Sequence, residues 1–146
     1  MHQRLASLAE VERGHVAVLE RLGRDDVRWL LWIKLDVAFE RANPGQRGRL
    51  FWFALLEDGR SIIAECRSND DLALDRRIDA DQEALLVELG WKRPDGWWTT
   101  NWHFHATIDD VAELGQLFST TARRVFGMAS FDVVEVGFQA ALVDQG

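Results

Sequence analysis

The sequence has a single cysteine and fewer basic than acidic residues, and both scarcities exclude classes of protein. Cys66 has no second cysteine with which to form a disulfide within the chain. A lone thiol inside an apolar run is typical of a small buried side chain, not of a nucleophile. The 17 lysines and arginines stand against 24 aspartates and glutamates, which gives a formal charge of −7. This charge opposes binding to nucleic acid or to an anionic membrane and fits a basic or mixed-charge protein partner.

The chain also lacks the motifs and long apolar runs that identify several common functions. Its longest uninterrupted apolar run, residues 29–33, is far too short to span a bilayer. Glu10 stands where a signal peptide would have its apolar run, so we expect a cytoplasmic protein without membrane contact. No G-x-S-x-G, P-loop or Rossmann fingerprint occurs. We therefore expect no enzyme activity, no catalytic residues and no cofactor.

What the chain does contain is the length and the aromatic content of one globular domain. Its 146 residues suit a single domain over 1–146, and seven tryptophans and eight phenylalanines provide large apolar side chains. Leu5 and Leu8 begin a series of apolar residues at helical spacing, which predicts an N-terminal helix within residues 1–24. Residues 27–140 then form the core of the domain.

Three strands are predicted in the first half of this core. Residues 27–40 alternate apolar and polar side chains, as expected of a strand with one buried face. Residues 50–56 and 61–67 follow as two further apolar strands. The Asp58-Gly59 pair between them favours a tight hairpin, so the three strands should form an antiparallel meander.

Leu30 and Trp32 are apolar residues on the face of the first predicted strand that should be polar. A strand that is apolar on both faces is typical of a sheet covered on both sides. The sequence therefore predicts that a helix or a partner protein covers part of this second face.

The stretch from Asp79 to Trp102 organises the second half of the core and carries four of the seven tryptophans. Asp79 and Gln82 have the spacing of a capping box, and Gly90 has the position of a helix-ending glycine, so a helix is predicted between them. The strand that follows places Trp98 and Trp102 on its apolar face. We expect both to be buried and to cost about 3–5 kcal/mol when replaced by alanine.

Trp97 falls on the opposite, polar face of that strand and is the better candidate for a contact residue. A helix with an apolar stripe over residues 111–125 and a strand over residues 131–140 complete the chain. The predicted order is α-β-β-β-α-β-α-β. This order predicts an α+β fold in which a mainly antiparallel sheet packs against helices.

His103 and His105 are separated by one residue, a spacing seen in metal sites. Nothing at local spacing supplies the third ligand that such a site needs, so we expect two exposed histidines and no metal. The tryptophans could instead line a pocket for a sugar or an aromatic ligand. A small-ligand-binding domain is therefore an alternative hypothesis.

A set of short motifs within residues 29–138 resembles the TY-Chap domains, which are named for type III secretion chaperones and YbjN-like proteins. The motifs are Ala64-Glu65-x-x-Ser68-Asn69, Leu72, Ile78-Asp79-x-x-Gln82, Leu85-x-x-x-Leu89-Gly90-Trp91, Trp97-Trp98 and Thr121-x-x-x-Val125-Phe126-Gly127. The most specific of them is Leu-Gly-Trp followed by paired tryptophans. The resemblance implies a chaperone-like α+β fold, commonly dimeric, that holds a peptide or a partner protein without nucleotide or metal. It transfers no binding residue.

The leading hypothesis is a non-enzymatic, chaperone-like module that binds a protein or peptide partner through apolar surface and a sheet edge. The candidate contact residues are Leu30, Trp32, Trp52 and Trp97. An inhibitor or immunity-type protein with one specific partner is the alternative in the same class. The apolar series from Leu5 and the doubly apolar first strand also predict a homodimer.

Overall fold

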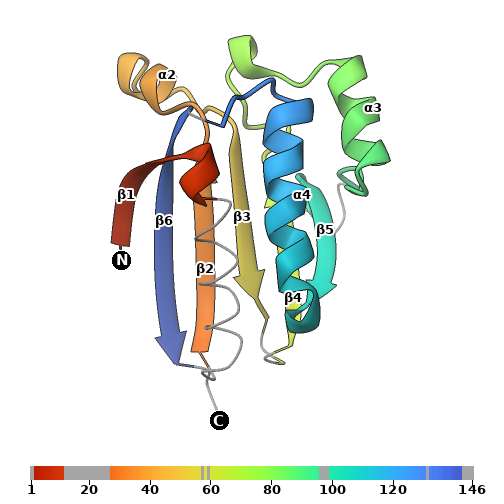
Figure 1. Ribbon diagram of the computed structural model, residues 1–146. Helices are drawn as coiled ribbons and strands as arrows, with labels where there is room; N and C mark the ends of the chain where they lie inside the picture. Colours follow the sequence, from red (N-terminus) through yellow and green to blue (C-terminus); the bar gives the residue numbers. More distant parts are fainter. Residues whose placement is uncertain are drawn as a thin grey trace.

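The structure of the protein, a computed structural model, describes residues 2–11, 27–56, 58, 60–95, 99–130 and 132–142. These residues form one six-stranded sheet, and α3 and α4 lie over one of its faces (Figure 1). The strands are β1 (His2–Ser7), β2 (Val27–Lys34), β3 (Leu50–Leu55), β4 (Ser61–Cys66), β5 (Trp102–Thr107) and β6 (Val133–Leu142). The helices with described bounds are α2 (Val37–Ala42), α3 (Ala80–Glu88) and α4 (Val111–Arg124), with 3₁₀ turns at η1 (Leu74–Arg76) and η2 (Ile108–Asp110).

The sheet has the order β1-β6-β2-β3-β4-β5, and each neighbouring pair is antiparallel. β2, β3 and β4 are neighbours in sequence order, so the predicted meander is confirmed, and β5 extends it by one strand. On the other side of β2 the sheet is completed by β6, which in turn pairs with β1. The predicted α+β class is confirmed, while the predicted order of elements is wrong in two places.

The first difference lies at the N-terminus, where the sequence predicts a helix within residues 1–24. His2–Ser7 instead form strand β1, and helical structure begins at Leu8. Ala6 of β1 is buried, whereas Leu5 is 47% exposed and pairs with Glu135 of β6. Pairing with a strand from the far end of the chain decides the structure here, and local spacing does not report it. Residues 12–24 of the predicted helix lie outside the described residues.

The second difference lies within residues 27–40, which the sequence predicts as one strand. β2 ends at Lys34, and Val37–Ala42 form the short helix α2. Asp36 fixes the turn between them, because its Oδ2 accepts the backbone N–H of Arg49 at 2.7 Å and the Nε–H of the same arginine at 2.8 Å. The apolar alternation beyond this point is therefore not continued as a strand.

The helix predicted from the capping box is confirmed as α3. Asp79 Oδ1 accepts the backbone N–H of Gln82 at 2.8 Å, and Gln82 Oε1 accepts that of Asp79 at 3.0 Å. Gly90 follows the helix with a φ of 105°, which residues with a Cβ atom rarely adopt. Trp91 is buried and donates its indole N–H to Thr121 Oγ1 of α4 at 2.9 Å. This hydrogen bond fixes the turn after α3 to α4.

The strand predicted after this turn begins later than the sequence indicates. β5 starts at Trp102, and residues 99–101 belong to the loop before it. Trp102 is only 2% exposed, so its predicted burial is confirmed. Trp97 and Trp98 lie outside the described residues, and their placement stays a prediction.

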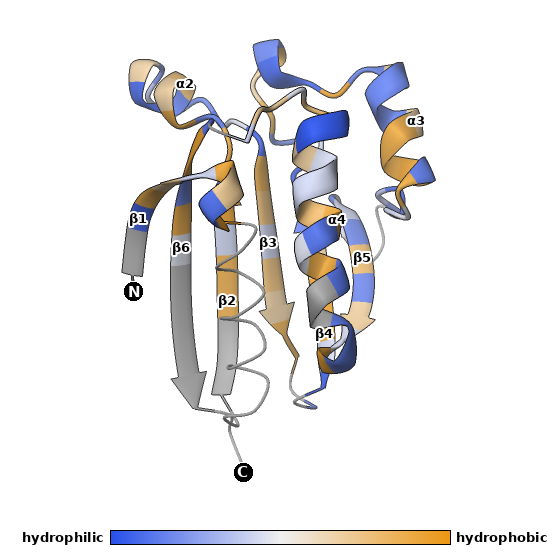
Figure 2. Cartoon of the chain, viewed as in Figure 1, coloured by the Kyte–Doolittle hydropathy of each residue, from blue (hydrophilic) through white to orange (hydrophobic). Residues whose placement is uncertain are grey.

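The core lies between the sheet and the helices α3 and α4. Phe51 and Phe53 of β3 are buried and contact Phe118 of α4, with ring centroids 4.5 Å and 6.2 Å apart. Figure 2 shows apolar residues along most of β3, whereas α4 alternates apolar and hydrophilic residues. Burial alternates along β3 even though its residues are nearly all apolar, and the buried residues are those that face α4.

Candidate functional site

The face of the sheet opposite α3 and α4, called here the open face, carries three of the predicted contact residues. Side chains alternate along a strand, so the neighbours of the buried Leu31 and Phe51 point away from the helices. These neighbours include Leu30 and Trp32 on β2 and Trp52 on β3, and all three are half-buried. The fold thus brings together residues that lie far apart in the sequence.

Trp32 and Trp52 lie directly opposite each other on β2 and β3, yet their indoles lean apart. The ring of Trp32 lies against Gly137 of β6, where an added Cβ atom would overlap it. Trp52 donates its indole N–H to Glu65 Oε2 of β4 at 2.9 Å. One indole is therefore held toward β6 and the other toward β4, which leaves space between them.

A hollow of about 390 Å³ opens at this place on the open face. We call it the sheet-face hollow, and it is lined by Leu30, Trp32, Arg47, Leu50, Trp52, Arg67, Asp71 and Asn101. Its floor is made of leucine and tryptophan side chains from β2 and β3. Its rim consists of two arginines, one aspartate and one asparagine. Such a lining can bind an apolar side chain and, beside it, polar backbone groups.

The arginines of the rim are held by bonds within the protein. Arg67 Nη1 donates to the carbonyl oxygen of Gly48 at 2.9 Å, and Arg47 Nη1 lies 3.7 Å from Asp71 Oδ1. Burial lowers the pKa of Arg67, because its guanidinium group is partly removed from water. The rim therefore presents positioned N–H donors beside an apolar floor.

Glu65 connects the tryptophan pair to the loop before β5. Its Oε2 accepts from Trp52, and its Oε1 accepts the hydroxyl of Thr99 at 2.5 Å. Two residues on, Asn101 Oδ1 accepts the backbone N–H of Ser68 at 3.1 Å. These bonds hold one indole and one wall of the hollow in fixed positions.

The sequence predicts part of this hollow and misses the rest. Leu30, Trp32 and Trp52 line it, whereas Trp97 lies outside the described residues. Leu50 could have been predicted, because it shares the even-numbered face of its strand with Trp52. No sequence signal joins the rim residues, which come from three loops, before β3, after β4 and before β5.

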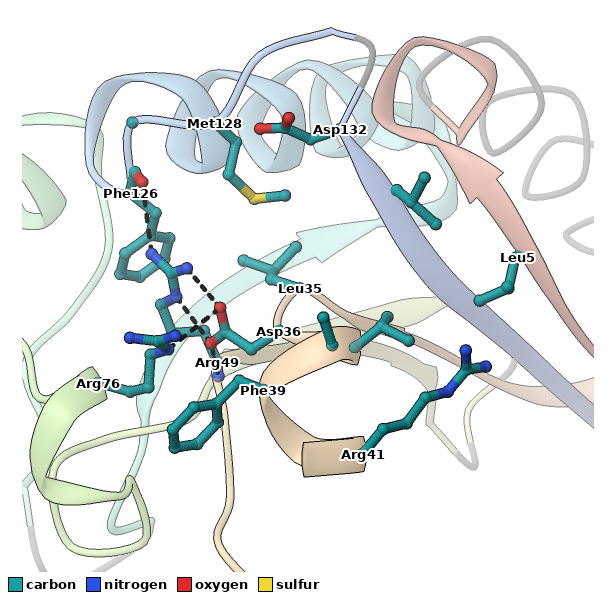
Figure 3. A pocket seen from close by; sticks show the side chains of 14 residues that line it. Leu5, Leu35, Asp36, Phe39, Arg41, Arg49, Arg76, Phe126, Met128 and Asp132 are labelled. Atoms are coloured by element: carbon teal, nitrogen blue, oxygen red, sulfur yellow. Dashed lines mark hydrogen bonds and ion pairs between the residues drawn. The ribbon is translucent and has the colours of Figure 1, made fainter. Parts of the chain in front are cut away.

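A second hollow, of about 550 Å³, lies at the end of the sheet where β2 ends and β3 begins (Figure 3). We call it the end hollow. At its centre, Arg49 donates its Nε–H and an Nη2–H to the two oxygens of Asp36, which is itself only 7% exposed. Arg76 of η1 lies on the other side of this carboxylate, with its Nε 3.5 Å from Oδ1. No spacing or motif in the sequence predicts this cluster.

The charge of Asp36 is maintained by its two arginines. Burial raises the pKa of the carboxyl group, but hydrogen bonds from Arg49 and the attraction of Arg49 and Arg76 outweigh this effect. The pKa of Asp36 is therefore held below its ordinary value. One carboxylate is shared by two guanidinium groups.

The histidine pair is arranged differently from the prediction. His105 is exposed as expected, but His103 is only 6% exposed, and its backbone forms two hydrogen bonds with Lys92, at 2.8 Å and 3.1 Å. The two imidazole centroids are 5.6 Å apart. In the described part of the chain, no group of three or more His, Cys, Asp or Glu residues could hold a metal ion.

Cys66 is buried, as the sequence predicts. Burial raises the pKa of its thiol to about 12, so the reactive thiolate is not populated at neutral pH. Among the helices that the structure describes, none is both long and apolar enough to cross a membrane.

Comparison with known proteins places this geometry in a family. Residues 2–138 match the family described as TY-Chap3, T3SS (YopN, CesT) and YbjN peptide-binding chaperone 3. No curated protein and no solved structure is significantly similar to the chain. The matched range contains every residue that lines the two hollows. The chain therefore belongs to the TY-Chap3 family of peptide-binding chaperones.

Proposed function

We propose that the protein is a non-enzymatic, chaperone-like module that holds a segment of a partner protein in the sheet-face hollow. The observation that carries this proposal is the divergence of Trp32 and Trp52 on the open face, in a member of a peptide-binding family. The contacts that hold each indole also keep the hollow open without a ligand. A preformed apolar hollow lowers the ordering cost of binding.

The partner segment inserts an apolar side chain between the two indoles, against Leu30 and Leu50. Burying one such side chain stabilises a complex by about 1.5–3 kcal/mol, which corresponds to a factor of about ten or more in affinity. Arg47 and Arg67 on the rim donate hydrogen bonds to carbonyl or carboxylate oxygens of the segment.

The open face is a better docking surface than the outer edge of β5. β1 and β5 are the edge strands among the described residues. Part of the outer edge of β5 already forms backbone hydrogen bonds, because His103 pairs there with Lys92. Addition of a strand to β5 would have to displace this pairing, whereas insertion into the sheet-face hollow displaces nothing described.

Site-specific photo-crosslinking tests the proposed surface in cells. A photoreactive amino acid is placed at Leu30, which lines the hollow, or at Leu74, an apolar residue that is 76% exposed and does not line it. We expect position 30 to crosslink protein segments that position 74 does not. Mass spectrometry of the crosslinks identifies the segments. Identical crosslinks from both positions would contradict the proposal.

Affinity measurements with the identified segment then test the tryptophans. We expect Trp32→Ala and Trp52→Ala each to weaken binding by about tenfold or more in calorimetry, because each removes an indole that contacts the inserted side chain. Leu74→Ala is the matched control and should bind like the wild type. One tight segment would indicate a dedicated inhibitor or escort of a single partner, and many weak segments would indicate a general chaperone.

Dimerisation is a separate prediction. It is based on an apolar helix stripe from Leu5 and on the doubly apolar first strand. The first of these observations no longer supports it, because Leu5 belongs to β1 and not to a helix. The other support, the apolar open face, is the same surface that we propose for the peptide. Light scattering at high protein concentration should therefore report a dimer that the bound segment dissociates, and a monomer at all concentrations would contradict dimerisation.

A further inference from the structure

The end hollow carries excess positive charge, although the chain as a whole has a formal charge of −7. Arg41, Arg49 and Arg76 line it together with two aspartates, Asp36 and Asp132. Figure 3 shows Arg41 on α2, apart from the cluster that Asp36, Arg49 and Arg76 form. A partly enclosed space with more cationic than anionic groups attracts an anion.

Neither aspartate accepts a hydrogen bond from Arg76, although its Nε forms an ion pair with Asp36 at 3.5 Å. Both oxygens of Asp36 accept hydrogen bonds from Arg49, and Asp132 Oδ2 accepts the backbone N–H of Ala129 at 2.7 Å. Arg76 Nε is buried and has no hydrogen-bond partner among the described residues, since Asp36 Oδ1 is 3.5 Å away. The Nε atom itself is buried, so an anionic ligand would contact Arg76 through the Nη groups of its partly exposed side chain.

The side chain of Arg76 is nonetheless well positioned to bind. Its guanidinium carbon lies 4.3 Å from the centroid of the Phe39 ring, and the side chain is 33% exposed. Stacking on an aromatic face orients a guanidinium group while its N–H groups stay at the edge. Carboxylates fit this edge with two parallel hydrogen bonds.

The opposite wall of the end hollow is apolar and accessible. Leu5 of β1 and Val133 of β6 line it and are 47% and 55% exposed. The C-terminal residue of a peptide can carry a carboxylate and an apolar side chain together, which matches the two kinds of group that line the end hollow. An aspartate or glutamate side chain has only one or two methylene groups beside its carboxylate.

We propose that the end hollow binds the C-terminal carboxylate of a peptide whose last side chain is apolar. The carboxylate accepts hydrogen bonds from Arg76, and the last side chain packs against Leu5 and Val133. The end hollow then recognises the C-terminal residue of a partner chain.

This inference rests on the proposed peptide-binding function but uses different residues. Arg47 lines the sheet-face hollow and Arg49 lines the end hollow, while Gly48 between them packs against the side chain of Asp36. The two hollows share no lining residue, so we expect variants of Arg76 to leave the sheet-face hollow intact and variants of Trp52 to leave the end hollow intact. Failure of one site is distinguishable from failure of the other.

Titration of the isotope-labelled protein with short peptides tests the inference. The probes are an acetylated tetrapeptide of three alanines and a final leucine with a free carboxylate, the same peptide as its C-terminal amide, and an amidated peptide with an internal glutamate. We expect the free acid to shift the Arg76 Nε–H resonance and to bind at least tenfold more tightly than either amidated peptide. Equal affinities for the acid and the amide, shifts confined to Trp32 and Trp52, or no binding would overturn the proposal.

Two variants and a control locate the site. Arg76→Gln removes the guanidinium group that is proposed to bind the carboxylate. Val133→Asp introduces a carboxylate at an exposed position of the opposite wall, where it would repel the peptide's own carboxylate. Each should weaken binding of the free acid at least tenfold while circular dichroism stays unchanged. Arg60→Gln removes an exposed arginine whose 2.8 Å ion pair is with Asp109, and it should bind like the wild type. Unchanged affinity in Val133→Asp would contradict the proposal even if Arg76→Gln failed to fold.

Discussion

Three consecutive aromatic residues on β3 have two different surroundings. Phe51 and Phe53 are at most 1% exposed and contact Phe118 of α4 on the covered face. Trp52, between them, faces the other way, is half-buried and donates a hydrogen bond to Glu65. The two faces of one strand therefore divide the tasks, since the covered face stabilises the fold and the open face provides the proposed binding surface.

Four of the described tryptophans divide in the same way. Trp91 and Trp102 are each 2% exposed, and Trp91 also hydrogen-bonds across the core to Thr121. Trp32 and Trp52 line the sheet-face hollow. Aromatic content alone thus does not identify a binding surface, because the direction of each side chain decides its role.

The largest expected difference between the two faces is in unfolding free energy. Phe51→Ala should destabilise the protein by about 3–5 kcal/mol, because it leaves a cavity among buried rings. Trp52→Ala should cost only about 1 kcal/mol, roughly the value of its hydrogen bond, since its ring already contacts solvent. Urea unfolding measures both. Equal losses would show that the open face is a second core.

Asp36, at the end of the sheet, should give the next largest effect. Asp36→Asn should cost about 1.5–3 kcal/mol at neutral pH, because it removes charged hydrogen bonds to Arg49. The lowered pKa of Asp36 means that the unfolded chain binds this proton more readily than the folded one. The free energy that the Asp36 carboxylate contributes to folding is therefore fully present above the ordinary pKa of aspartate. It is lost as the pH falls through the lower pKa that Asp36 has in the folded protein.

Urea unfolding at a series of acidic pH values tests this linkage. The difference in stability between the wild type and Asp36→Asn should shrink as the pH falls below about 4, the ordinary pKa of aspartate. A difference that stays constant from neutral to strongly acidic pH would show that the charge of Asp36 does not stabilise the fold.

Gly137 tests the packing of the open face itself. Gly137→Ala should cost about 1–3 kcal/mol, because its Cβ atom would overlap the indole of Trp32. The double variant Trp32→Ala with Gly137→Ala should regain most of this loss, since the overlap is then absent. Strictly additive losses in thermal unfolding would mean that the indole does not lie against this glycine.

The smallest effect is expected at the capping box of α3. Asp79→Ala should cost about 1 kcal/mol, because it removes the bond to the backbone N–H of Gln82. It should leave peptide affinity unchanged, since α3 lies over the covered face. Asp70→Ala, at an exposed aspartate outside any helix, is the control for the loss of charge. Weaker peptide binding by Asp79→Ala would indicate that the covered face also contributes to the site.

Local sequence signals predicted the elements whose causes are local. The Asp79 capping box, the glycine at Gly90 and the hairpin at Asp58 are confirmed, because each depends on residues within a few positions. Asp58 illustrates this, since its Oδ1 accepts the backbone N–H of Arg60 and of Ser61 at 2.9 Å and 2.7 Å.

Elements decided by distant partners were predicted incorrectly or missed. β1 is a strand because it pairs with β6, and the short helix α2 follows a turn that Arg49 fixes through Asp36. The candidate site shows the same division. Alternation along β2 predicted that Leu30 and Trp32 share a face, whereas the arginines of both hollows come together only through the fold.

The indole N–H resonances of the protein report directly whether the open face binds the partner segment. The segment identified by crosslinking at position 30 is added to the isotope-labelled protein. We expect the resonances of Trp32 and Trp52 to shift as the segment is added until the site is saturated, while those of Trp91 and Trp102 stay in place. Shifts at Trp91 and Trp102 with Trp32 and Trp52 unchanged would contradict it.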